Sequence, residues 1–308
     1  MGFIETLLTA TLSAAPALIF ATLGAVVSER SGVVNIGIEG MMRVGAFSAA
    51  VAALHLPTPV AVVVGCAVGA LAAGLHALLS LKARADQVVS GMAINLVALA
   101  GVTFLLETWY QPSGTPAVQA LSRYRFEWLE GVPLLSALNG HTLLTPLALL
   151  LPFALHLVLQ RTPWGLRVRT VGERPAAAAT LGLSVLGLRT ACVLLSGVLA
   201  GLGGAALSLS TLDRFEQHMP AGLGFMAVAA MVFGRWSPLG AAGAALFFSV
   251  ASALRISLGS SALGITEHIP QGFMLALPYV LTLLVLALQG RRTRAPAALG
   301  TPWIPESR

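Results

Sequence analysis

Long runs of apolar residues, separated by short polar segments, cover most of this chain. A membrane-spanning helix needs about 20 mostly apolar residues, and by that measure the runs predict a series of spans. The predicted spans are 6–27, 41–56, 58–80, 88–107, 141–160, 189–209, 221–234, 239–257 and 271–289. The runs at 41–56 and 221–234 are short enough to be half-helices. The pattern therefore predicts an all-α, polytopic transmembrane helical bundle of about 8–10 spans, some of them broken.

Composition supports this reading and limits the fold class. Of the 308 residues, 56% are hydrophobic and 10% are charged, with a mean hydropathy of +0.85, whereas soluble domains are about 25% charged. The apolar runs are continuous rather than alternating, which disfavours a porin-like barrel. We expect one transmembrane domain over 1–290 and a disordered cytoplasmic tail over 291–308, because that tail is basic and then rich in proline.

The net charge of +6 does not indicate a nucleic-acid partner, because the basic residues gather in the segments between spans. One alternation of the spans places 14 of the 18 lysines and arginines on the same side. Basic residues concentrate on the cytoplasmic side of membrane proteins. The N-terminus is therefore expected outside, the C-terminus inside, and the protein in the membrane as a multi-pass chain.

Residues 29–42 place acidic and amide side chains among glycines between two apolar runs. Broken helices at membrane depth can line a transport path, and ionisable residues there are usually functional. The candidate path residues are Asn35, Gly37, Glu39, Gly40, Met41 and Asn95. Two alternatives stay open: 28–40 could be a turn at the cytoplasmic edge with Glu29 paired to Arg30 or Arg43, and Asn95 could only join helices by hydrogen bonds.

The polar segment 161–189 contains five arginines and, at its centre, the sequence GERPAAAATLG. Pro175 suits a first helical turn, the alanines that follow are strong helix formers, and Gly182 can end a helix. We expect a short helix from Glu173 to Gly182, with Glu173 near its positive end. Such a smooth helix could dock on a cytoplasmic partner, or it could lie on anionic lipid with help from neighbouring arginines.

These motifs resemble those of a known family. The pattern at 172–182 resembles the EAA-type coupling loop of permease subunits of bacterial ABC importers. Residues 29–42 (ERSGVVNIGIEGMM) and 222–241 (GLGFMAVAAMVFGRWSPLGA) are similar to the branched-chain amino acid/simple-sugar permease family. Within it they resemble the nucleoside and simple-sugar permeases that work with basic-membrane-lipoprotein receptors. The later Ile-x-Leu-Pro of the classical coupling loop is missing after Gly182.

The resemblance implies a transport subunit of the bacterial inner membrane, with no catalytic residues and no cofactor of its own. A separate cytoplasmic ATPase would bind ATP and contact the coupling helix. The residues implied in that contact are Gly172, Glu173, Pro175, Ala176, Ala177 and Gly182. A second, different permease chain and an extracytoplasmic substrate-binding lipoprotein are the other implied partners, and nucleosides or simple sugars are the implied solutes.

Two rival functions remain at this point. An ion-coupled secondary transporter of small polar solutes would use Glu39, Asn95 or Glu107 within the membrane. An intramembrane enzyme is disfavoured, because no spacing of a nucleophile and a base is visible. The six histidines show no metal-binding spacing, and the sequence has no GxxxxGK[ST] phosphate loop.

Overall fold

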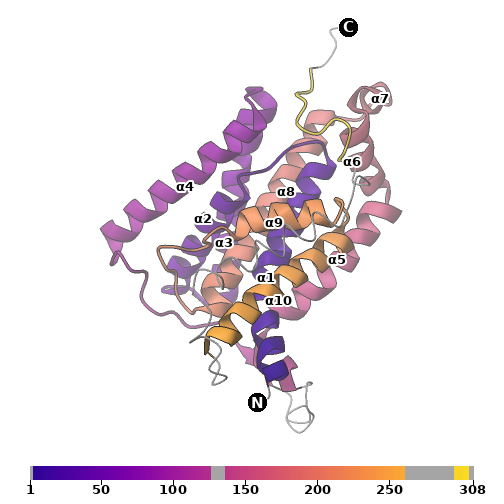
Figure 1. Ribbon diagram of the computed structural model, residues 1–308. Coiled ribbons are helices and arrows are strands. Elements are labelled where there is room, and N and C mark those ends of the chain that lie inside the picture. Colours follow the sequence, from indigo (N-terminus) through magenta and orange to yellow (C-terminus); the bar gives the residue numbers. More distant parts are fainter. Residues whose placement is uncertain (1–2, 126–135, 261–294, 305–308) are drawn as a thin grey trace.

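A computed structural model of the chain describes residues 3–125, 136–260 and 295–304. Most of its longer helices lie alongside one another, some in one direction and some in the other, in a single bundle (Figure 1). The helices are α1 (Phe3–Arg30), α2 (Ile38–Ala53), α3 (Thr58–Ala77), α4 (Gln87–Trp109), α5 (Leu144–Arg161), α6 (Pro163–Glu173), α7 (Pro175–Thr180), α8 (Val185–Ala206), α9 (Leu223–Phe233) and α10 (Pro238–Ser260). Two single π-helical turns, η1 (Leu78–Lys82) and η4 (Leu207–Thr211), extend α3 and α8.

Within these described ranges, five helices are long and apolar enough to cross a membrane. They are Phe3–Arg30, Thr58–Lys82, Gln87–Trp109, Leu144–Arg161 and Val185–Thr211, and they confirm five of the predicted spans. The two runs expected to be half-helices form α2, with 16 residues, and α9, with 11 residues. The run 239–257 lies in α10, while the predicted span 271–289 lies outside the described residues.

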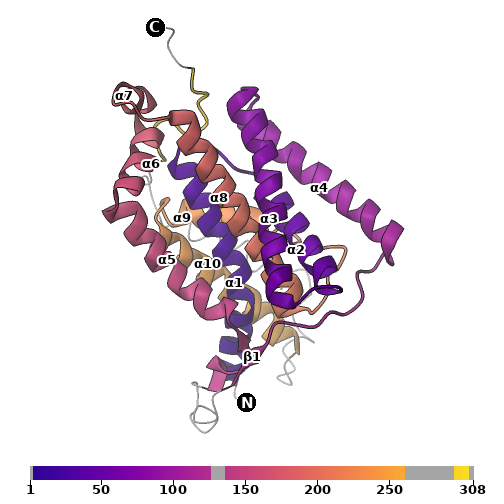
Figure 2. The ribbon, with the colours of Figure 1, turned by 180° about the vertical axis from the view of Figure 1, so that it is seen from behind.

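The bundle is built around α1 and α8. In each of these two spans, 78% of the most apolar stretch is buried, compared with 28% in the spans of α3 and α4. α8 packs against α1, α2 and α3, while α10 covers another side of α1. α4 stands at the edge of the bundle and leans away from α3 in both views (Figures 1 and 2).

Glycine makes the closest helix crossing possible. Where α2, α3 and α8 meet, a methyl group added to Gly45 would lie 2.6 Å from the Cα of Gly201, and one on Gly65 would lie 2.9 Å from the carbonyl oxygen of Gly45. Lipid is as apolar as the side chains of these helices, so the hydrophobic effect does not drive helices together within a membrane. Close packing of their backbones provides the attraction instead. The glycines of the sequence therefore fix how the central helices pack.

At the end opposite α6 and α7, short strands join the helices. β1 (Arg123–Tyr124) pairs antiparallel with β2 (His141–Thr142), and a 3₁₀ turn, η3 (Ser136–Leu138), precedes β2. The side chain of Ser136 donates a hydrogen bond to the carboxylate of Glu5 near the start of α1. This end of the bundle is thereby linked to the start of the chain.

The C-terminal segment differs from its prediction. We expected 291–308 to be disordered, yet residues 295–304 lie on the bundle beside α6 and α8. Ala298 is buried, and its backbone N–H donates to the carbonyl oxygen of Gly172 at 2.9 Å. The prediction rested on the basic and proline-rich composition of the tail, and it missed the hydrogen bonds that the backbone of residues 297–300 makes to Gly32, Gly172 and Glu173. Residues 291–294 and 305–308 lie outside the described residues.

Candidate functional site

Between α1 and α2, residues 31–37 form a loop that is not helical but is almost completely buried. Its backbone groups bind side chains from distant helices. The N–H of Val34 donates to Oε1 of Gln87 at 2.7 Å, and the carbonyl oxygen of Val34 lies 3.0 Å from Nε2 of His76. Since a carbonyl only accepts, Nε2 carries the proton, and Nδ1 is left to accept from Ser90 Oγ at 3.0 Å. Buried backbone that leaves a helix needs such partners.

The two candidate asparagines link this loop to neighbouring helices, Asn35 from within the loop and Asn95 from α4. Asn35 is fully buried, and its Nδ2 donates to Ser196 Oγ of α8 at 2.9 Å. Asn95 of α4 donates from Nδ2 to the carbonyl oxygen of Ile36 at 3.0 Å and accepts from the N–H of Gly40 at 2.7 Å. Asn95 therefore joins α4 to the loop and to the start of α2 by hydrogen bonds, and its place in a transport path stays a prediction.

Glu39 lies at the start of α2 and caps the start of α9. The N–H groups of Gly222 and Gly224 donate to its two carboxylate oxygens at 2.8 and 2.7 Å. The first N–H groups of a helix have no partner inside the helix, and their partial positive charge favours an anion. Gly222, at the N-cap, has no side chain to supply one. A negative charge from α2 therefore fixes where α9 begins.

The other end of α9 is bound by the end of α1. Trp236 Nε1 donates to Oε2 of Glu29 at 2.7 Å, and Arg30 Nε donates to the carbonyl oxygen of Trp236 at 2.6 Å. The pairing of Glu29 with Arg30 or Arg43, which belonged to one of the open alternatives, was wrong, because the carboxylate accepts hydrogen bonds from the indole of Trp236 and the backbone of Asn35. Segment 29–39 thus holds both ends of α9.

A second stretch without helix, residues 212–222, leads from η4 to α9 and contacts α2 through Phe215 and Gln217. Arg43, one helical turn after Glu39, is 7% exposed and donates from Nη1 to the carbonyl oxygen of Gln217 at 2.9 Å. The guanidinium has five N–H donors, so this bond occupies one of them. Arg43 therefore brings a buried charge to the place where α2 meets the non-helical stretch.

Between the end of α5 and the start of α8, residues 162–184 contain two helices, α6 and α7, rather than one. α6 begins after Thr162, whose hydroxyl accepts from the N–H of Gly165 at 3.2 Å, with Pro163 in the first turn. The prediction that Glu173 starts the short helix was wrong. Glu173 ends α6, because the chain turns sharply at Arg174, and its carboxylate accepts from the N–H of Ala297 at 3.2 Å.

The short helix α7 otherwise begins and ends as predicted. Pro175 is its first residue, and Gly182 follows it with a positive φ of 77°. Ala176 and Ala177 are exposed, while Ala178 is buried. Gly172 is different in kind: a methyl group there would collide with the carbonyl oxygen of Arg30. The predicted coupling residues therefore divide into an exposed surface on α7 and a tight internal contact at the end of α6.

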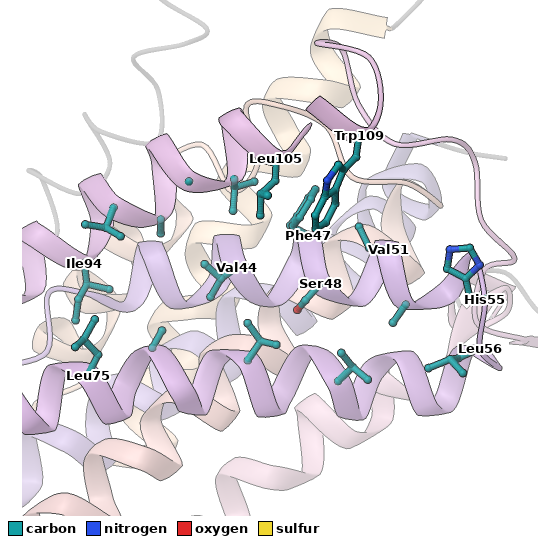
Figure 3. Close-up of a pocket in the computed structure, with 18 residues that line it drawn as sticks. Val44, Phe47, Ser48, Val51, His55, Leu56, Leu75, Ile94, Leu105 and Trp109 are labelled. Carbon is teal, nitrogen blue, oxygen red and sulfur yellow. The ribbon is translucent and has the colours of Figure 1, made fainter. Parts of the chain in front are cut away.

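A large pocket lies apart from these sites. It has a volume of about 720 Å³ and lies between α2, α3 and α4 (Figure 3). Phe47 and Trp109 stack at one part of it, with ring centroids 6.4 Å apart. Ser48 and His55 are its few polar contributors, and none of the six candidate path residues lines it. Its apolar chemistry suits hydrocarbon rather than a polar solute.

Sequence reasoning missed several residues that hold the loop and the helices. These are His76, Gln87, Arg189, Ser196 and Trp236. Each is polar within or beside an apolar run, which is the one signal that could have drawn attention to them. Their partners are distant in sequence, so no local spacing marks them.

Comparison with known proteins decides the family. A family model described as the permease component of branched-chain amino acid transport systems matches residues 7–286. The chain belongs to this permease family. This permease is 39% identical to the guanosine ABC transporter permease protein NupQ of Bacillus subtilis, over 96% of its own length and 95% of the relative's.

Two relatives from one organism differ in their similarity to this permease. The permease is 40% identical to the nucleoside ABC transporter permease protein NupC of Lactococcus lactis, over 93% of both chains. It is 26% identical to NupB of the same strain, also named a nucleoside ABC transporter permease protein, over 78% of its own length and 70% of NupB. The permease is thus an ABC transporter permease and a multi-pass membrane protein, more similar to one of these two L. lactis chains than to the other.

Proposed function

We propose that this permease is the membrane subunit of a bacterial ABC importer that carries nucleosides. The observation that supports this most strongly is its 39–40% identity to NupQ and NupC across nearly the whole of all three chains. On this proposal the chain is not an enzyme and has no cofactor, because a separate cytoplasmic ATPase binds and hydrolyses ATP. It lies in the inner membrane with its N-terminus outside and α6 and α7 in the cytoplasm.

The ATPase would bind at α7. Ala176 and Ala177 present small, exposed side chains there, and Leu181 just beyond the helix is 76% exposed. A short helix with little side-chain bulk can enter a groove on a partner, and a large exposed apolar side chain beside it favours a protein contact. Gly172, Glu173, Pro175 and Gly182 would set the position of α7 rather than touch the ATPase.

The solute path would follow the two non-helical stretches beside α2. Transporters bind solutes where helices are interrupted, and here loop 31–37 and residues 212–222 meet α2 near Glu39 and Arg43. The predicted path residues would shape this region by holding the loop and α9 in place. They are Asn35, Gly37, Glu39, Gly40, Met41 and Asn95. Arg43, with N–H donors beyond the one bound to Gln217, is the side chain we propose to contact the solute's oxygen or nitrogen acceptors.

Two further partners complete the proposal. A second, paralogous permease would pair with this chain, as suggested by similarity to both NupC and NupB of one organism. An extracytoplasmic lipoprotein would deliver the solute to the outer face, on the basis of the resemblance to permeases that work with such receptors. Membrane lipid would surround the exposed faces of α3 and α4.

The function is tested by uptake in a strain that lacks the gene for this chain. Uptake of radiolabelled guanosine and uridine is expected to be lost and to return when the gene is restored. Excess unlabelled ribose or glucose should not compete. Loss of sugar uptake instead, with nucleoside uptake intact, would contradict the proposed solute. Nucleoside uptake by liposomes that contain this chain alone under a proton or sodium gradient would favour an ion-coupled transporter.

A further inference from the structure

The C-terminal segment 295–303, which we call the strap, crosses the junction between α6 and loop 31–37. Its backbone binds to both. The N–H of Ala298 donates to the carbonyl oxygen of Gly172 at 2.9 Å, and the N–H of Gly300 donates to the carbonyl oxygen of Gly32 at 3.2 Å. The strap therefore joins the end of α6 to the start of the loop by main-chain hydrogen bonds.

Arg189 of α8 binds the strap through hydrogen bonds from its side chain. Its side chain is fully buried, and its guanidinium donates to three carbonyl oxygens: Ser31 at 3.2 Å, Thr301 at 2.9 Å and Ala298 at 3.5 Å. A buried charge is costly unless its hydrogen bonds are satisfied. Two of these three acceptors belong to the strap, and the third belongs to the loop. Arg189 thus depends on both segments and holds them together.

The far end of the strap reaches α7. Trp303 packs against the cluster formed by Val171 of α6, Ala178 of α7 and Val185 of α8. α7 itself packs on α6 and α8. The strap consequently touches, within nine residues, the hydrophobic underside of α7, the end of α6, Arg189 and the buried loop. Figures 1 and 2 show the segment running from the bundle past α6 and α7.

We propose that the strap transmits displacement of α7 to loop 31–37, so that ATP hydrolysis drives transport efficiently only when the strap is present. Arg189 is the positioning residue for this link. The inference rests on the proposed function, because it assumes that an ATPase moves α7. Coupling between two sites in a protein is typically worth a 5–150-fold effect, so loss of the strap should lower transport per ATP by about tenfold.

Three truncations test the strap in the assembled importer, reconstituted with its ATPase, second permease and receptor in liposomes. Ending the chain after Ile304 keeps every contact described above and is the control. Ending it after Thr301 removes Trp303, and ending it after Arg294 removes the whole strap while keeping the basic residues before it. Uptake and ATP hydrolysis are measured in the same liposomes.

The expected result is a stepwise fall in solute taken up per ATP hydrolysed, reaching about tenfold for the chain that ends after Arg294, with the ATPase still bound. A merely structural role would lower uptake and hydrolysis together and leave their ratio unchanged. Ratios equal to that of the full chain in all three truncations would overturn the proposal. If the full chain itself neither binds an ATPase nor takes up solute, the proposed function fails instead.

A point variant guards against misfolding of the shortest chain. Trp303→Ser removes the contact with the α7 cluster but keeps the main-chain bonds of the strap. Its neighbour Ile304 is 59% exposed, so Ile304→Ser is the matched control. We expect the ratio of uptake to hydrolysis to fall about fivefold in Trp303→Ser and to stay at the full-chain value in Ile304→Ser. Equal ratios of uptake to hydrolysis in the two variants would contradict the proposed role of the strap.

Discussion

Loop 31–37 and helix α7 lie at the same end of the permease, and neither spans the membrane, yet they are held in opposite ways. The loop is buried and bound by side chains of three other helices, including His76, Gln87 and Ser196. In α7, by contrast, Ala178 is the one fully buried residue, while Ala176 and Ala177 are exposed. The loop is thus an internal part of the fold, whereas α7 is a surface. Substitutions that affect the loop should therefore lower stability, and substitutions on α7 should lower ATPase binding.

The largest effect on stability is expected from Glu39→Ala. The substitution leaves the N–H groups of Gly222 and Gly224 without their carboxylate partner and releases the start of α9. Hydrogen bonds to a charged group are worth about 1.5–3 kcal/mol each, so the free energy of unfolding should fall by about 3 kcal/mol. Denaturant unfolding in detergent micelles measures it.

Glu107 is exposed on α4, which makes Glu107→Ala the matched control. It should leave the free energy of unfolding within about 0.5 kcal/mol of the unmodified chain. An equal loss in both variants would mean that the carboxylate of Glu39 has no special role at the start of α9.

A smaller loss is expected from His76→Phe. The phenyl ring fills similar space but cannot donate to the carbonyl oxygen of Val34 or accept from Ser90. An unpaired buried group costs about 1–3 kcal/mol, so unfolding should become easier by about 2 kcal/mol. His55 is exposed at the far end of α2, and His55→Phe should be close to neutral in the same unfolding measurement. An unchanged free energy of unfolding in His76→Phe would show that the loop does not depend on the hydrogen bonds of His76.

Gly182→Ala should have a smaller and local effect. Gly182 has a positive φ of 77°, which costs a residue with a side chain about 1 kcal/mol. The turn after α7 should shift, and the affinity for the ATPase should fall a few-fold, as read from titration of the purified ATPase. Gly101→Ala, in an open position on α4, is the control. No difference between the two would exclude a role for this turn.

The sequence predicted the parts of this fold that depend on local patterns. Continuous apolar runs gave the long spans, and Pro175 and Gly182 marked the two ends of α7. Asp86 caps α4 as a residue of its type does, accepting from the N–H of Val89 at 2.9 Å. These features follow from hydrophobicity, fixed φ values and capping chemistry within a few residues.

The sequence did not predict the features that depend on distant contacts. The tail was predicted to be disordered from its basic and proline-rich composition, because its hydrogen bonds to Gly172 and Gly32 involve partners more than 120 positions earlier in the chain. α6 was missed, although Thr162-Pro163 marks its start, because its composition is polar. One alternative paired Glu29 with an arginine, but the indole of Trp236, 207 positions later, donates to its carboxylate instead. The role of the candidate residues in a transport path stays a prediction.

On the proposed function, the ATPase docks on α7 and does not contact the buried loop. Ala177→Arg tests it most directly, with Ala117→Arg, at an exposed position between α4 and β1, as the control. Affinity purification of the permease should recover at least about tenfold less ATPase with Ala177→Arg. The free energy of unfolding should stay within about 0.5 kcal/mol. Undiminished recovery of the ATPase with a folded Ala177→Arg permease would contradict the account.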